Sequence, residues 1–129
     1  MRRMLQRDRA SASLGMTLVT DEPGHAVVTM TVREDMTNGF ELTHGGFVFA
    51  LADTAFAVAC NDDEHVTVAA GADIQFLAPT RAGQVLRADA RMRSRVGRAG
   101  VCDVTVTDES GAVVAEFRGR SLTTREALA

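Results

Sequence analysis

A single carboxylate stands within a fifteen-residue run of apolar or small residues, Gly46 to Cys60. Asp53 is the only acidic side chain in that run, which begins directly after His44 and Gly45. The run predicts a helix that is apolar on every side, which is typical of a protein interior. An unpaired carboxylate there is costly or has its pKa raised. Such an acid is either paired structurally or used as a base or nucleophile, and we favour use because perturbed acids concentrate at functional sites.

Two glycines, Gly45 and Gly46, stand where this helix is expected to begin. The first N–H groups of a helix lack partners within the helix and lie at the positive end of its dipole, so they can stabilise a developing negative charge. Glycine also lets a ligand approach the backbone closely. The alternative is that both glycines merely permit a tight turn from the loop into the helix.

The rest of the chain must position these groups, and its patterns predict mainly strands. Period-two alternation and β-rich runs predict strands at residues 26–32, 66–77, 84–96, 101–107 and 113–122. Short turns between the later strands favour antiparallel pairing. We therefore expect an α+β fold, in which a curved antiparallel β-sheet wraps around one long central helix and a partner subunit supplies further cover.

The remaining segments predict little regular structure. We expect a short, fraying helix at residues 2–12, a connector at 13–23, and an irregular segment at 35–45 with a turn at Asn38-Gly39. The length of 129 residues fits one domain, 1–129, whose residues 1–13 are an N-terminal helix or a flexible extension.

Composition excludes several classes of function. The net charge of −3 argues against nonspecific nucleic-acid binding. No apolar stretch reaches the ~20 residues that span a bilayer, and the segment 1–13 lacks the apolar region of a secretory signal, so we expect no membrane partner and a cytoplasmic protein. Cys60 and Cys102 have neither metal-ligand nor redox-motif spacing, so no metal is expected.

Several motifs resemble one known family from about Leu14 onward. They are the segment 38–46 (NGFELTHGG), the segments 72–79 and 117–119, and, in the apolar run, Phe49, Leu51, Ala52, Asp53, Ala55 and Ala57. The pattern is similar to the hotdog-fold acyl-CoA thioesterases, specifically the phenylacetate-degradation (PaaI-type) branch. The most specific part is His-Gly-Gly, a six-residue apolar gap, and then Asp.

The resemblance implies an activity and a hotdog fold. It implies hydrolysis of phenylacetyl-CoA, or of a hydroxylated or medium-chain relative, to free acid and coenzyme A, without a cofactor. It makes the Gly45 N–H the oxyanion donor and Asp53 the nucleophile or the general base on water. It also implies active sites at a dimer interface and dimers that pair into a homotetramer.

Geometry leads to a dimer independently of the resemblance. Asp53 lies eight residues beyond Gly45, which is about 12 Å along a helix. One thioester carbon cannot lie near both groups of one chain. If both take part, they must come from two copies whose helices run alongside each other, so a homodimer is the minimum.

Two further polar residues precede the helix. His44 could donate to the thioester carbonyl, orient the loop, or bond structurally to the backbone. Asn38 could position the attacking water or the acyl carbonyl through its amide, or simply form the Asn-Gly turn.

Gly46, Thr54 and Phe47 are the candidate substrate-binding residues. Thr54 contacts substrate or fixes the loop, unless its hydroxyl bonds back to an upstream carbonyl. Phe47 is expected to belong to the core or to border the acyl pocket. Five arginines are expected to form a solvated strand face or to supply contacts to the phosphates of coenzyme A: Arg87, Arg91, Arg93, Arg95 and Arg98.

Two other functions remain open. A hotdog hydratase or dehydratase would use an imidazole and a carboxylate around the acyl β-carbon, as His44 and Asp53 superficially permit. A noncatalytic acyl-CoA sensor would need an effector domain, and it would not explain an acid inside an apolar helix.

Overall fold

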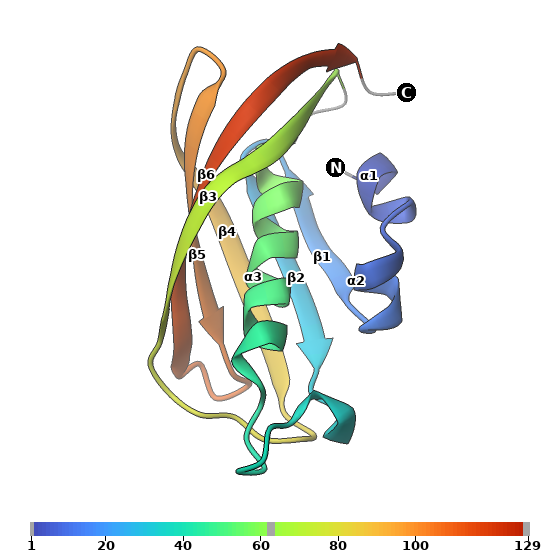
Figure 1. Cartoon of the computed structure of the whole chain (residues 1–129), viewed down its shortest axis with the longest axis vertical. Helices are drawn as coiled ribbons and strands as arrows, with labels where there is room; N and C mark the ends of the chain where they lie inside the picture. Colours follow the sequence, from blue (N-terminus) through green and yellow to red (C-terminus); the bar gives the residue numbers. More distant parts are fainter. Residues whose placement is uncertain (1, 62–63, 128–129) are drawn as a thin grey trace.

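A computed structural model describes residues 2–61 and 64–127 and shows a curved sheet wrapped around one long helix (Figure 1). In chain order the elements are α1 (Arg2–Gln6), α2 (Arg9–Ser13), β1 (Thr17–Glu22), β2 (His25–Thr31), the 3-10 turn η1 (Glu34–Met36), α3 (Gly45–Cys60), β3 (His65–Phe76), β4 (Val85–Val96), β5 (Ala99–Thr107) and β6 (Val113–Ala127). The predicted helix and five predicted strands are confirmed, with shifts of one or two residues at their ends, except that β6 continues from the predicted residue 122 to residue 127.

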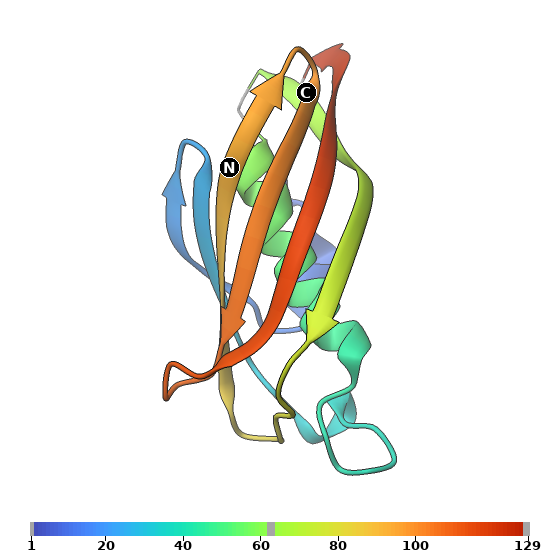
Figure 2. The same cartoon turned by 90° about the vertical axis from the view of Figure 1, so that its left-hand side faces the viewer.

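The sheet has six strands in the order β1-β2-β4-β5-β6-β3, and every neighbouring pair is antiparallel. Strands β4, β5 and β6 pair in sequence order, as their short turns predict. Strand β3 instead crosses to the far edge of the sheet and pairs with β6 alone (Figure 2). One edge of the sheet is therefore β3, with α3 packed against the concave face.

The expected connector at residues 13–23 is wrong, because residues 17–22 form the edge strand β1. This strand is mostly exposed and its pairing with β2 shifts register between Leu18 and Thr20, so its sequence carries no clean alternation. The expected N-terminal helix is two short helices, and Asp8 caps the second. Met1 of the segment 1–13 and Ala129 of the expected domain lie outside the described residues.

The core lies between α3 and the sheet. Leu86, Ala88 and Ala90, which alternate with charged residues along β4, are fully buried. The ring of Phe56 packs on β6, where a Cβ atom on Gly119 would lie 2.7 Å from it. Glycine is thus required at residue 119 for the helix to approach the sheet this closely.

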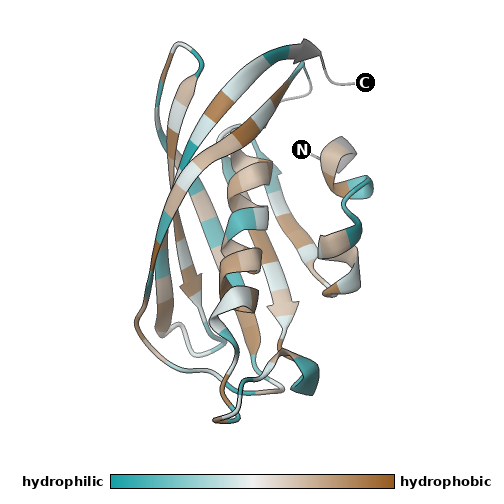
Figure 3. Ribbon diagram, in the orientation of Figure 1, coloured by the Kyte–Doolittle hydropathy of each residue, from teal (hydrophilic) through white to brown (hydrophobic). Residues whose placement is uncertain are grey.

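One side of α3 is not covered by the described chain. Gly46, Ala50, Asp53 and Ala57 are all partly or fully exposed, and their spacing puts them on one helical face. The expectation that the helix is buried on every side is therefore not met within one copy. Figure 3 shows α3 as apolar except for one hydrophilic band. The only charged residue of this helix is Asp53. Among the described residues, no helix is long and apolar enough to cross a membrane.

Candidate active site

His44 forms the N-cap of α3. The Nδ1 atom of its ring accepts the Gly46 N–H at 3.0 Å. The backbone N–H of His44 donates to the Met36 carbonyl at 2.8 Å. An accepting Nδ1 places the proton of the neutral imidazole on Nε2. The structure thus gives the His44 ring a backbone partner and leaves Nε2 as a donor on an exposed side chain.

The Gly45 N–H is a free donor at the start of α3. Within the described part of the chain, no group accepts a hydrogen bond from it, whereas the next N–H is taken by His44. The Phe76 ring lies against this glycine, since a Cβ on Gly45 would be 3.0 Å from Cζ of Phe76. The backbone at Gly45 can therefore approach and donate to a ligand oxygen in a way that a larger residue would obstruct.

Asn38 organises the loop before the helix. Its Oδ1 accepts the N–H groups of Phe40 at 2.9 Å and Leu42 at 3.3 Å. Glu41 in this loop has a left-handed φ of 62°. The side-chain oxygen of Asn38 thus forms the turn, which was the structural alternative, while its Nδ2 amide donates to no group among the described residues.

A cavity of about 350 Å³ brings Asn38 and Gly45 together. It lies between the 38–43 loop, the start of α3 and the end of β3. Its walls are lined by Asn38, Leu42, Thr43, Gly45, Val48, Phe76, Leu77, Ala78, Pro79, Thr80 and Val114. Thr80 donates to the Thr43 hydroxyl at 2.7 Å and so ties the loop to the segment after β3. The cavity is mainly apolar, and Gly45, whose N–H has no acceptor among the described residues, lines it.

Asp53 does not line this cavity. Its side chain is partly buried, and no described group forms a hydrogen bond or an ion pair with its carboxylate. Burial, followed by the negative charge of Asp8, raises the pKa of Asp53. No ion pair or hydrogen bond among residues 2–61 and 64–127 therefore explains why this acid is partly buried. Among the described residues of one copy, Asp53 and Gly45 do not line a common cavity.

The candidate binding residues have varied surroundings. The Thr54 hydroxyl lies 3.1 Å from the Ser11 hydroxyl of α2, a partner that the sequence did not predict. Phe47 packs partly on the core, with its ring edge-on to His44 at 6.1 Å. A Cβ on Gly46 would lie 3.1 Å from His44 Nδ1, so this glycine makes room for the helix cap.

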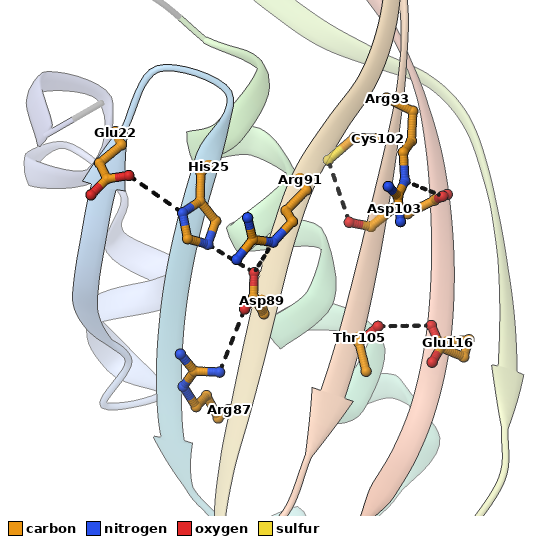
Figure 4. A network of polar contacts seen from close by, with 10 residues as sticks. All are labelled: Glu22, His25, Arg87, Asp89, Arg91, Arg93, Cys102, Asp103, Thr105 and Glu116. Atoms are coloured by element: carbon orange, nitrogen blue, oxygen red, sulfur yellow. Dashed lines mark hydrogen bonds and ion pairs between the residues drawn. The ribbon is translucent and has the colours of Figure 1, made fainter. Parts of the chain in front are cut away.

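Most of the predicted arginines lie on the outward face of the sheet (Figure 4). Arg87 and Arg91 pair with Asp89, and Arg93 pairs with Asp103. Arg95 is different, because its Nη2 donates to the Cys60 carbonyl at the end of α3, at 2.8 Å. Carboxylates or helix carbonyls thus already occupy four of the five guanidinium groups, which favours the solvated-face interpretation.

Sequence reasoning missed two residues next to the site. Asp8 gave no signal because it stands in a polar segment, far along the chain from Asp53. Phe76 stood in a recognised motif, but only the fold shows its ring against Gly45. No three His, Cys, Asp or Glu side chains of the described chain gather where a metal ion could bind.

Comparisons with known proteins identify the family of this chain. The model of the thioesterase superfamily matches residues 40–115. The acyl-coenzyme A thioesterase PaaI of Escherichia coli K12 is 42% identical over 118 residues, which cover 92% of this chain and 84% of that protein.

Solved structures share the fold. The E. coli PaaI protein from the phenylacetic acid degradation operon superposes with a TM-score of 0.95 at 39% identity, covering 99% of this chain and 93% of its own. A Streptococcus mutans protein bound to acetyl-CoA has a TM-score of 0.81 at 28% identity, covering 84% of this chain and 88% of its own. The predicted hotdog fold is therefore confirmed.

Proposed function

The chain belongs to the thioesterase superfamily and is an acyl-CoA thioesterase of the PaaI type, and we propose that it hydrolyses phenylacetyl-CoA or a related aryl or medium-chain acyl-CoA. The observation that carries the proposed site is the Asp53 carboxylate, which has no partner in the described chain and lies in an apolar helix whose first N–H, at Gly45, is also free. One group can supply a base or nucleophile and the other can stabilise an oxyanion.

The Gly45 N–H donates to the thioester carbonyl oxygen, where negative charge develops during attack. In one route, Asp53 removes a proton from water, the resulting hydroxide adds to the carbonyl carbon, and the tetrahedral intermediate expels the thiolate of coenzyme A. The proton then passes from Asp53 to the thiolate. In the other route, the carboxylate itself bonds to the acyl carbon as the C–S bond breaks, and water then hydrolyses the mixed anhydride.

The site requires two copies. The rise of about 12 Å between Gly45 and Asp53 is too long for one carbonyl group. Strand β3 is an edge strand with exposed apolar side chains on or just after it: Val68, Phe76 and Leu77. The exposed side of α3 consists of small residues around Asp53. An unpaired edge favours pairing with a second chain, and small residues let a second helix approach closely. The two active sites of a homodimer, and its pairing into a homotetramer, are part of the proposal.

The cavity beside Gly45 is proposed to hold the acyl group. Apolar side chains such as Leu42, Val48 and Val114 line it, which suits an aromatic or aliphatic acyl group better than a charged one. Asn38 lines the same cavity, and its amide nitrogen, which has no acceptor among the described residues, is proposed to bond to the acyl carbonyl or the attacking water. The partners are thus acyl-CoA and a second copy of the chain, and because the substrate is a coenzyme A thioester, the cytoplasm is the expected location.

The test is release of coenzyme A from phenylacetyl-CoA and from a series of straight-chain acyl-CoAs, for the wild type and Asp53→Asn. We expect turnover by the wild type, fastest with aryl or medium-chain groups, and almost none by the variant. Burial raises the pKa of Cys60 to about 11 and of Cys102 to about 12, which makes both thiols slow toward thiol reagents. Binding without turnover would indicate a sensor, and hydration of an enoyl-CoA would indicate a hydratase.

A further inference from the structure

Helix α2 docks on α3 through a buried chain of hydroxyl groups next to Asp53. Asp8, the N-cap of α2, accepts the Ser11 N–H at 2.9 Å through Oδ1 and the Ser11 hydroxyl at 2.7 Å through Oδ2. The Ser11 hydroxyl also lies 3.1 Å from the Thr54 hydroxyl of α3. Ser11 is 4% exposed and Thr54 is 9% exposed. These three side chains thus connect the N-terminal segment to the residue that follows Asp53.

The direction of the hydrogen bond between Ser11 and Thr54 follows from the number of protons that each hydroxyl can donate. A serine hydroxyl has one proton, and that of Ser11 goes to the Asp8 carboxylate. The Thr54 hydroxyl must therefore donate to Ser11. The resulting order, Thr54 to Ser11 to Asp8, ends on a carboxylate, which is the strongest acceptor available.

These hydrogen bonds link a second negative charge, that of Asp8, to the residue that follows Asp53. Burial is the main cause that raises the pKa of Asp53, and the negative charge of Asp8 acts in the same direction. On α3 itself, the charge of Asp53 is felt by Cys60, while Arg95 bonds to the carbonyl at the far end of the helix. No cation of the described chain is among the causes that shift the pKa of Asp53.

We propose that Asp8 is a positioning residue for Asp53: the Thr54–Ser11–Asp8 chain docks α2 on α3 and holds the Asp8 charge beside the catalytic carboxylate. The inference rests on the role proposed above for Asp53. The consequence is a stronger base, because repulsion by Asp8 makes the Asp53 carboxylate take up a proton more readily. Helix α2 with its N-cap thus helps to set the basicity of Asp53 and does not only cover α3.

The test compares Asp8→Asn and Ser11→Ala with Ser13→Ala. Asparagine remains a good N-cap but is uncharged. Ser13 is a matched control, since its hydroxyl bonds to the Ala10 carbonyl on the exposed side of the same helix. We measure kcat/KM for phenylacetyl-CoA against pH, and the titration of the Asp53 side-chain carboxyl carbon by NMR. In Asp8→Asn and Ser11→Ala, the acid limb of the rate profile and the Asp53 titration should both move to lower pH. Ser13→Ala should change neither.

A purely structural role would lower the melting temperature of Ser11→Ala and leave the Asp53 titration where it is in the wild type. An unchanged Asp53 titration in a folded Asp8→Asn protein would overturn the inference. Should that variant not fold, Asp8→Ser, which also retains a capping oxygen without charge, provides the same comparison. The NMR titration needs no turnover, so it separates this inference from the proposed function, which instead fails if Asp53→Asn stays active.

Discussion

The Nδ1 atom of His44 accepts the Gly46 N–H at 3.0 Å, so the residues on either side of Gly45 are bound to each other. This bond satisfies the second N–H of α3, whereas the first, at Gly45, has no acceptor among the described residues. The helix cap therefore selects which N–H is available to a ligand. It also directs the Nε2 proton of a neutral His44 away from the helix.

The first prediction separates the two possible roles of His44. His44→Ala removes the cap and should destabilise the fold by about 1 kcal/mol, with a loss of activity, whereas His44→Asn provides another good cap. We expect the Asn variant to keep both its melting temperature and most of its kcat. A stable His44→Asn protein that has lost about a hundredfold in kcat would instead indicate that Nε2–H donates directly to the substrate.

The second prediction concerns Gly45. Its substitution by Ala places a methyl group 3.0 Å from the Phe76 ring and in the path of the thioester carbonyl. Kinetics should show a loss of about a hundredfold in kcat/KM, the size expected for an oxyanion donor that is no longer reached. The Gly45→Ala, Phe76→Leu double variant relieves the ring contact alone. Full recovery in the double variant would mean that the ring, and not carbonyl approach, caused the defect.

The third prediction is a pH dependence of stability. Burial and the Asp8 charge raise the pKa of Asp53 above its ordinary 3.8, so the folded state binds this proton more tightly than the unfolded state does. The ionised carboxylate therefore costs stability, and this cost grows as pH rises from 3.8 through the folded-state pKa.

Asp53→Asn should accordingly melt at a higher temperature than the wild type at pH 7, and the difference should shrink toward pH 3, where both forms are uncharged. Only the ionised Asp53 carboxylate acts in catalysis. Whereas stability falls as pH rises through the pKa of Asp53, kcat/KM should therefore rise through the same pKa. Thermal unfolding at one fixed protein concentration checks the first part. A variant that is less stable at pH 7 would show that Asp53 has a stabilising partner.

The fourth prediction tests the exposed side of α3. Ala50 lies on it, next to Asp53, so Ala50→Arg should leave the fold intact but prevent a second helix from packing there. Sedimentation should show the wild type as a dimer or tetramer and this variant shifted toward the monomer, with activity lost in parallel. Ala112→Arg, at an exposed position in the β5–β6 hairpin, is the matched control. Equal dissociation of both variants would contradict an interface on α3.

The long helix and most strands were predictable because their patterns are local. The apolar run of α3 and the alternation of β4 depend on burial that the chain itself provides. Strand β1 was missed because it is an edge strand with little burial and an irregular register. The position of β3 next to β6, and not next to β4, depends on the whole sheet and leaves no local signal.

The site was predictable as a set of residue types, but not as a set of contacts. An acid in an apolar run and a glycine pair at a helix start are visible in the sequence. The bond between His44 and Gly46, the Phe76 ring on Gly45, and the Asp8 charge near Asp53 join residues through the fold. The exposure of one side of α3 around Asp53 likewise could not be predicted, because it depends on how the sheet and the N-terminal helices pack against the helix.

The most direct test of the shared site mixes two inactive proteins. Asp53→Asn keeps Gly45, and Gly45→Ala keeps Asp53, so a mixed dimer contains one intact site and one doubly altered site. After unfolding and refolding together in equal amounts, the mixture should regain about a quarter of wild-type coenzyme A release, because half of the dimers are mixed and each has one working site of two. Each variant refolded alone should remain nearly inactive. A mixture that stays inactive, although mass measurement shows mixed dimers, would contradict a site built from Gly45 of one copy and Asp53 of the other.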